Sequence, residues 1–299
     1  MTDRRSLARK PFTTNTVEFG KMLELFPERV SVIAEGDSWF AYPRKGLINL
    51  GPPSNTIDQL ARMHRFNLLQ LSSSGDEILD MLSGSRKQKL LELVQRFNPD
   101  FLLFSGGGND VVGKYTFEFF LTDGEGSSDW EAYLDAEAVD RRLDQVASCY
   151  RDLVDYCHDL SQRNAGVAGE AKPIRLVTHT YDYVVPDKRG AEFLGGLVGR
   201  VFLQRSLGPW MYPYLMRRKV PKSCHAPIAR YLIDQLADRL LQVAADHPDP
   251  FLLADTRKAV PRKHWLNEIH PDSKGFEKVA RRVFQVMKPW VRQFEAERA

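Results

Sequence analysis

This sequence of 299 residues has little cysteine, little excess charge of either sign and no long apolar run. The three cysteines, Cys149, Cys157 and Cys224, form no CxxC pair and no Cys/His spacing typical of zinc. This pattern suggests neither a disulfide framework nor a zinc site, and it favours a reducing compartment. The 42 basic and 39 acidic residues leave a formal net charge of +3, too small to require a nucleic acid or an anionic membrane as partner.

Apolar stretches are all too short to cross a membrane, because a spanning helix needs about 18 or more apolar residues in a row. The amino terminus carries charge without the apolar segment of a secretion signal. Arg4 and Arg5 are followed by polar residues where a twin-arginine export signal is apolar. These absences predict a cytoplasmic protein with no transmembrane segment.

Short apolar segments alternate with stretches of helical spacing along the whole chain. Five of these segments have the length and composition of buried strands, at 31–34, 66–71, 101–104, 174–178 and 251–254. The alternation predicts one α/β domain, residues 1–299, with a five-stranded parallel sheet, and Ser273 is the predicted cap of its last helix. Two insertions interrupt it. Residues 114–137 are a predicted surface flap, and residues 186–224 are either an apolar cap over the site or a peripheral subdomain with its own small core.

Polar and glycine residues follow the predicted strands. Gly36 lets the chain turn after the first strand, so that the hydroxyl of Ser38 can stand at the carboxyl edge of the sheet. By itself this turn is equally well explained as an ordinary βα turn whose serine caps a helix. Gly75 and Asn109 follow the next two strands, and His270 precedes the last helix.

Together these residues have the parts that acyl transfer needs: a nucleophile, a base and donors for an oxyanion. Ser38 can attack, His270 can take its proton, and the amides of Ser38 and Gly75 with the side chain of Asn109 can stabilise the negative charge. Each residue alone is common in turns and loops. Their order and coincidence carry the hypothesis. Two-metal phosphodiester chemistry is disfavoured, because no suitable carboxylate and histidine cluster is present.

Four short blocks resemble the signature blocks of the SGNH, or GDSL-type, esterase and lipase superfamily: Gly36-Asp37-Ser38-Trp39, Ser74-Gly75-Asp76, Gly107-Gly108-Asn109-Asp110 and His270-Pro271. The resemblance spans nearly the whole chain. It implies a flavodoxin-like three-layer α/β/α fold with five parallel strands and a serine esterase acting on a small-molecule or lipid ester without metal or organic cofactor. It also implies an oxyanion hole of Ser38, Gly75 and Asn109, with His270 as the base.

Two positions depart from the pattern of this family. Trp39 replaces the leucine that usually follows the nucleophile, an apolar exchange. Asn267 stands three residues before His270, where the family has its acid. An amide cannot stabilise an imidazolium by charge, although its carbonyl can still accept a hydrogen bond from the ring.

Three interpretations follow for the missing acid. Asn267 or a backbone carbonyl orients His270, or Glu268 supplies the carboxylate, or catalysis is impaired. If neither side chain acts, Asp182 or His179 at the end of the fourth strand is the next candidate. The sequence therefore predicts a serine hydrolase of carboxylic esters, with a catalytically weak family member that binds an acylated ligand or a partner protein as the alternative. It leaves the oligomeric state open.

Overall fold

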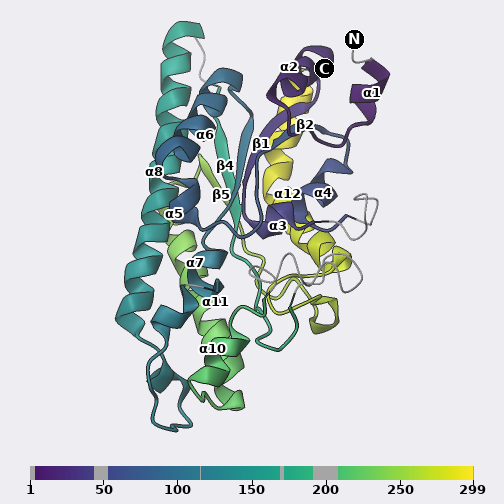
Figure 1. Ribbon diagram of the computed structural model, residues 1–299. Helices are drawn as coiled ribbons and strands as arrows, with labels where there is room; N and C mark the ends of the chain where they lie inside the picture. Colours follow the sequence, from purple (N-terminus) through teal and green to yellow (C-terminus); the bar gives the residue numbers. More distant parts are fainter. Residues whose placement is uncertain (1–3, 44–52, 115, 169–171, 191–207, 299) are drawn as a thin grey trace.

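The computed structural model describes residues 4–43, 53–114, 116–168, 172–190 and 208–298. A sheet of five parallel strands lies at its centre in the order β2-β1-β3-β4-β5 (Figure 1). The strands are β1 (Val30–Gly36), β2 (Phe66–Gln70), β3 (Phe101–Ser105), β4 (Arg175–His179) and β5 (Phe251–Ala254). This is the flavodoxin-like strand order, so the predicted fold is confirmed.

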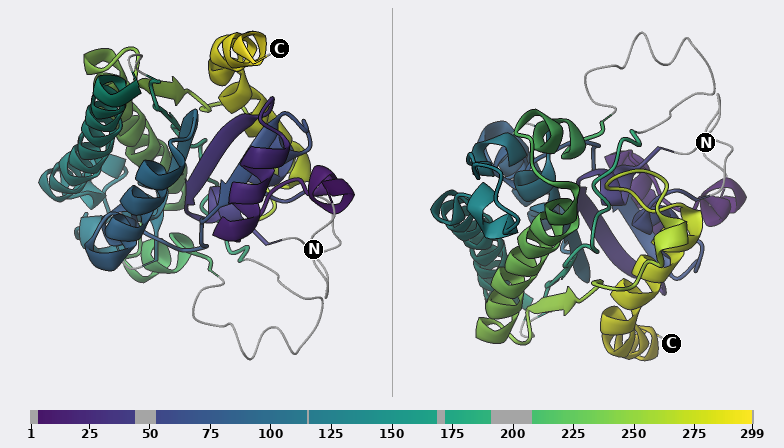
Figure 2. Two further views of the ribbon diagram at one scale, coloured as in Figure 1. Left: turned by 90° about the horizontal axis from the view of Figure 1, so that it is seen from above. Right: turned by 90° about the horizontal axis from the view of Figure 1, so that it is seen from below.

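Helices cover both faces of the sheet, as the two end-on views in Figure 2 show. One face is covered by α6 (Gly84–Phe97), α8 (Ala136–Ala168) and α11 (Lys222–Asp246), and the other by α4 (Thr56–Ala61) and α12 (Ser273–Glu297). The remaining helices of the described residues are α1 (Arg4–Arg9), α2 (Thr16–Leu25), α3 (Ser38–Ala41), α5 (Ile78–Met81), α7 (Gly108–Val112) and α10 (Tyr212–Arg217), with the 3₁₀ turns η1 (Phe117–Phe120), η2 (Trp130–Tyr133) and η3 (Arg262–His264). Within the described ranges, no helix is long and apolar enough to span a bilayer.

The strands are apolar on both faces because both faces are covered. In β1, Ile33 packs into the core under α6, α8 and α11, while Val32 and Ala34 pack into the core under α4 and α12. The same alternation of two residues runs through β3, where Leu102 and Leu103 enter opposite cores. The near-continuous apolar runs of the sequence follow from this double burial.

Parallel strands bring their carboxyl ends to one edge of the sheet. There β1 and β3 approach so closely that a Cβ atom on Gly36 would lie 2.7 Å from the carbonyl oxygen of Ser105. The amide of Asp37 donates to the same oxygen at 3.0 Å. Glycine is therefore required at the turn that leads into Ser38.

The first predicted insertion is tied to the domain. Phe117, Phe120 and Tyr133 are buried in the core beneath α8, and a β-bridge joins Leu121 to Leu134. This stretch is an anchored excursion and not a free flap.

Part of the second predicted insertion, residues 191–207, lies outside the described residues. In the described remainder, Trp210, Met211 and Leu215 are buried in the main core. The predicted cap of the last helix was wrong by one residue: Asp272 caps α12, because its carboxylate accepts from the Gly275 amide at 2.8 Å.

Candidate functional site

The Ser38 hydroxyl lies at the amino end of α3, at the carboxyl edge of the sheet. Asp37 caps this short helix, accepting from the Trp39 amide at 2.9 Å through its carboxylate and from the Phe40 amide at 3.1 Å through its carbonyl oxygen. The Ser38 amide has no hydrogen-bond partner among the described residues. A backbone donor is therefore left free beside the hydroxyl, as an oxyanion site requires.

His270 lies within hydrogen-bonding distance of this hydroxyl. Its Nε2 is 2.7 Å from the Ser38 Oγ, although the two residues are 232 positions apart in the chain. The indole of Trp39 donates to the carbonyl oxygen of Ile269 at 3.2 Å and so links the nucleophile turn to the histidine loop. The exchange of leucine for tryptophan thus adds a hydrogen bond that packing considerations alone did not predict.

Asn267 orients the histidine ring. Its Oδ1 accepts from the backbone amides of Ile269 at 3.1 Å and His270 at 2.8 Å, and it lies 3.1 Å from the Nδ1 of His270. The two amide donors identify this atom as the oxygen, so Nδ1 carries the ring proton and Nε2 is free to accept from Ser38. The Nδ2 of Asn267 donates to the Tyr42 hydroxyl at 3.1 Å, which fixes the side chain from behind.

Burial without a carboxylate keeps His270 neutral. Desolvation lowers the pKa of its imidazole to about 3, because the charged form has lost its water and gains no opposite charge in return. The ring is therefore ready to accept a proton over the whole neutral range. The imidazolium formed by that transfer is costly, and this cost weakens the base.

Glu268 faces away from the histidine. Its carboxylate accepts from the backbone amides of Trp210, Met211 and Tyr212, the last two at 2.9 and 2.7 Å. Burial raises its pKa to about 7 in spite of these donors. The Glu268 carboxylate thus binds the backbone amides at the start of α10. Of the two side chains that the sequence offered as partners of the His270 ring, Asn267 is the one that contacts it.

The two other predicted oxyanion donors, Asn109 and Gly75, differ in how they are held. Asn109, at the start of α7, donates one amide hydrogen to the Asp76 carbonyl oxygen at 2.9 Å, which leaves its second hydrogen available. The Gly75 amide, in the exposed loop after β2, has no partner among the described residues, and the Ser73 amide ties that loop to the Gly36 carbonyl at 2.9 Å. The place of Gly75 fits its predicted role, and the role itself stays a prediction.

Ser38 and Asn109 line a small cavity, which we call the catalytic hollow. Its volume is only about 10 Å³, and Ser38 itself is 6% exposed. The other lining residues are Asp37, Trp39, Gly108, Val112, Tyr181, Val184, Ile233 and Ile269. A space of this size holds about one water molecule or one methyl group.

A buried polar network beneath the nucleophile was missed by the sequence reasoning. The Tyr181 hydroxyl donates to Asp37 at 2.5 Å, and the Ser105 hydroxyl donates to the other oxygen of the same carboxylate at 2.8 Å. The Nε2 of His179 lies 3.0 Å from the Ser105 Oγ. A Cβ atom on Gly108 would lie 2.6 Å from the Tyr181 ring, so this tyrosine touches both the nucleophile turn and the loop of Asn109. Polar residues at the end of β4 were the available signal.

Burial controls the charge of this network. It raises the pKa of Asp37 to about 6 and lowers the pKa of His179 to about 3. Both ring nitrogens of His179 have partners within this network, Ser105 at Nε2 and the Tyr181 amide at Nδ1 at 3.3 Å, so His179 does not orient His270. Asp182, the other candidate at this strand end, accepts from the backbone amides of Lys258 and Val260 at 2.7 and 2.6 Å.

Among the residues that the structure describes, no three histidine, cysteine or carboxylate side chains gather as a metal site would require. The Ser38 hydroxyl, the His270 ring and the three amide donors are the groups that the site offers to a substrate.

Comparison with known proteins adds only distant likenesses. No family model and no curated protein matches the sequence. Among solved structures, the chain is similar to Est24, a carbohydrate acetylesterase from Sinorhizobium meliloti, at 12% identity, with 88% of this chain and all of that chain covered and a TM-score of 0.48. It is also similar to phospholipase A1 from Streptomyces albidoflavus (15% identity, 86% and 98% covered, TM-score 0.44) and to an extracellular lipase from Streptomyces rimosus (17%, 86% and 98%, 0.41).

These scores are below 0.5, so the fold assignment rests on the strand order and on the four blocks of the chain itself. All four blocks lie along the carboxyl edge of one parallel sheet, and the first and the last meet at the contact between Ser38 and His270. By its strand order and the placement of these blocks, the chain has the architecture of the SGNH hydrolases.

Proposed function

We propose that this protein is a serine hydrolase of carboxylic esters. The observation that carries the proposal is the chain of contacts from Ser38 Oγ to His270 Nε2 at 2.7 Å and from His270 Nδ1 to Asn267 Oδ1 at 3.1 Å. A buried serine and histidine in this arrangement, beside free amide donors, are the working parts of acyl transfer.

In the proposed reaction, the Ser38 Oγ attacks the ester carbonyl carbon and its proton passes to His270 Nε2. The carbonyl oxygen becomes an oxyanion, which the second amide hydrogen of Asn109 and the amides of Ser38 and Gly75 stabilise. His270 then returns the proton to the departing alcohol, leaving an acyl group on Ser38. A water molecule, activated by the same nitrogen, hydrolyses this acyl-enzyme.

The function is tested with p-nitrophenyl esters of graded chain length, using the wild-type protein and Ser38→Ala. We expect the variant to fold normally and to lose hydrolysis, since the hydroxyl contributes one hydrogen bond to packing. Circular dichroism and the melting temperature serve as the folding control. Turnover by Ser38→Ala at the wild-type rate would remove Ser38 from its role.

A catalytically weak protein that binds an acylated ligand is the second candidate. The neutral Asn267 and the small catalytic hollow support it, because both lower the rate expected for a bulky ester. Labelling with a fluorophosphonate probe separates the two, since only a nucleophilic Ser38 reacts covalently. Labelling of the wild type but not of Ser38→Ala supports the hydrolase.

We also propose a cytoplasmic location. Three free thiols support it: Cys149, Cys157 and Cys224 are all unpaired. Fractionation of the native host, with detection by antibody, tests this part of the proposal.

A further inference from the structure

A second, much larger cavity lies beside the catalytic hollow. Its volume is about 720 Å³, within the range of small-molecule sites. Val184 lines both cavities. Trp265, on its wall, packs edge-on against Trp39 with ring centroids 6.3 Å apart. One layer of side chains therefore separates the cavity from the residue that follows the nucleophile.

The lining of this cavity is apolar with a cationic rim. Val184, Val185, Val260 and Trp265 provide apolar surface, and the positive charges come from three separate parts of the chain. They are Lys188, Lys222, Arg230, Lys258 and Arg262. Such a surface suits a ligand that has both an organic part and a negative charge.

Acidic residues near the rim are already engaged. Asp182 uses its carboxylate on three backbone amides, those of Tyr183, Lys258 and Val260, at 2.6 to 2.7 Å. Asp187 pairs with Arg189 at 2.7 Å. Neither carboxylate lies within ion-pair distance of a lysine on the rim in the described part of the chain.

The cations divide into paired and unpaired ones. Arg230 pairs with Asp234 at 3.5 Å, and the neighbouring Arg257 is occupied by Asp255, Asp234 and Asp238. Four cations of the rim have no acidic partner among the described residues: Lys188, Lys222, Lys258 and Arg262. An excess of positive charge thus faces the cavity.

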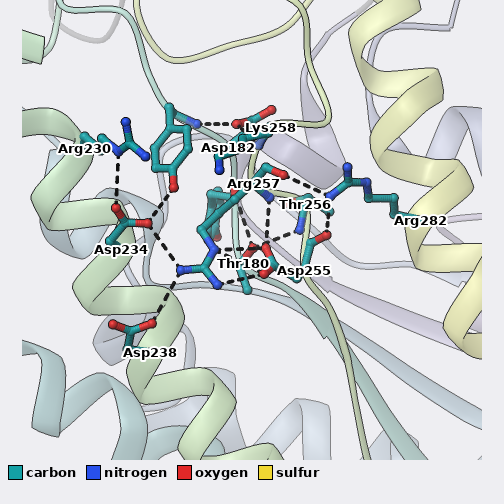
Figure 3. Close-up of polar contacts among 12 residues, drawn as sticks. Thr180, Asp182, Arg230, Asp234, Asp238, Asp255, Thr256, Arg257, Lys258 and Arg282 are labelled. Atoms are coloured by element: carbon teal, nitrogen blue, oxygen red, sulfur yellow. Dashed lines mark hydrogen bonds and ion pairs between the residues drawn. The ribbon is translucent and has the colours of Figure 1, made fainter.

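Figure 3 shows the polar contacts that hold the wall carrying Lys258. Asp182 fixes the Lys258 amide, whose residue has a left-handed φ of 61°. Behind it, the Arg257 guanidinium forms an ion pair with the Asp255 carboxylate at 2.7 Å, and Arg282 donates to the backbone carbonyl oxygens of both residues. The backbone of Lys258 is therefore fixed at the rim before any ligand arrives, which lowers the entropic cost of binding.

We propose that this cavity binds a phosphate group carried by the ester substrate. The inference rests on the proposed function and names the class of its substrate, an acyl ester whose alcohol bears a phosphate. Lysine ammonium groups bind phosphate as point charges, and a guanidinium offers paired donors. A phosphate dianion matches the charge excess better than a single carboxylate. The apolar lining of the cavity, Val184, Val185, Val260 and Trp265, accommodates the organic part.

The test compares charge-removing variants that differ only in place. Lys222→Gln combined with Arg262→Gln removes two charges from the rim, and both side chains are exposed. Lys278→Gln combined with Arg292→Gln removes one lysine and one arginine charge from the exposed face of α12 instead, and this variant is the matched control. The substrates are phenyl acetate and 4-acetoxyphenyl phosphate, which share one ester and differ by the phosphate.

We expect the wild type to prefer the phosphorylated ester by at least about tenfold in kcat/KM, through a lower KM. The rim variant should lose this preference and keep its rate on phenyl acetate, while the control variant should keep both. Raising the salt concentration should weaken the preference, since exposed charges are screened. A preference unchanged in the rim variant would overturn the proposal.

Two further experiments are needed. The first tells failure of the phosphate site from failure of the proposed esterase function, and the second tells a lipid phosphate from a soluble one. Calorimetric titration of Ser38→Ala with inorganic phosphate measures binding without catalysis: loss of heat in the rim variant but not in the control supports the cavity even if no ester is hydrolysed. Equal binding by both variants, or none by the Ser38→Ala parent, counts against it. Replacing the aryl esters by a lysophosphatidic acid and a monoacylglycerol then tells a lipid phosphate from a soluble one.

Discussion

Replacing Asn267 by aspartate tests how the catalytic base is controlled. The substitution keeps the size and the oxygen that faces His270, and it adds one negative charge. The two backbone amides that now hold Oδ1, at 2.8 and 3.1 Å, can donate equally well to a carboxylate. The Tyr42 hydroxyl accepts from Nδ2 and would have to donate to the new oxygen instead. The fold should therefore tolerate Asn267→Asp.

The distance in the structure sets the size of the effect. At an effective dielectric constant of about 20, unit charges 3.1 Å apart attract by about 5 kcal/mol, or roughly 4 pKa units. Burial now holds the pKa of His270 at about 3. The carboxylate favours the imidazolium and raises this pKa, while its own desolvation removes part of the gain. We expect a pKa between about 5 and 7 in the variant.

The sign of the pH dependence follows from the need for a neutral base. Hydrolysis falls when the pH drops below the pKa of His270, so in the wild type no acid limb from His270 should appear down to about pH 4. In Asn267→Asp the acid limb should appear between about pH 5 and pH 7. Above this limb the rate should rise by about tenfold or more, with an upper bound near 10⁴ taken from removal of the acid in a serine protease.

The assay is kcat/KM for p-nitrophenyl acetate across this pH range, recorded at the isosbestic wavelength of nitrophenol. NMR titration of the His270 ring in the Ser38→Ala background measures the pKa directly. Glu268→Gln is the matched control: its carboxylate contacts residues 210–212 and not the ring, so the acid limb should stay in place. An unchanged limb and rate in Asn267→Asp would refute the orienting role of Asn267.

Three further predictions concern the surroundings of the nucleophile. Asn109→Ala should lower kcat by about 10²-fold to 10³-fold with little change in KM, because the oxyanion forms only on the way to the tetrahedral intermediate; an effect on KM alone would make Asn109 a ground-state contact. Tyr181→Phe should lower kcat about tenfold and leave KM unchanged, because Asp37 loses its 2.5 Å donor beneath Ser38, whereas Tyr183→Phe, matched but outside the network, should not. Burial raises the pKa of Asp110 from 3.8 to about 7, so its contribution to stability is present below about pH 4 and is lost as the pH rises through 7. Asp110→Asn should therefore raise the free energy of unfolding by about 1 to 4 kcal/mol at pH 8 and by little at pH 4.5, as measured in urea, and an equal gain at both values would show that the charge is not the cause.

Local patterns in the sequence determined the sheet and predicted the residues that the structure brings together at the candidate site. Each strand is a short apolar run because both of its faces are covered, so its position can be read without knowing its neighbours. Asn267 and His270 are three residues apart in one tight loop, a spacing that made Asn267 one of the candidates for orienting the ring. The parallel strand order then accounts for the meeting of Ser38 with His270 across 232 positions.

Only the tertiary structure decided which neighbours act on these residues. Glu268 is adjacent to Asn267 in sequence, yet it faces the other way because the free amides at the start of α10 lie behind the loop. Tyr181 reaches Asp37 from the loop that follows β4, much later in the chain. The cationic rim is assembled from segments near residues 188, 222 and 260, none of which carries a pattern by itself. Such contacts depend on how loops pack against one another, and a periodicity or a short motif does not encode that packing.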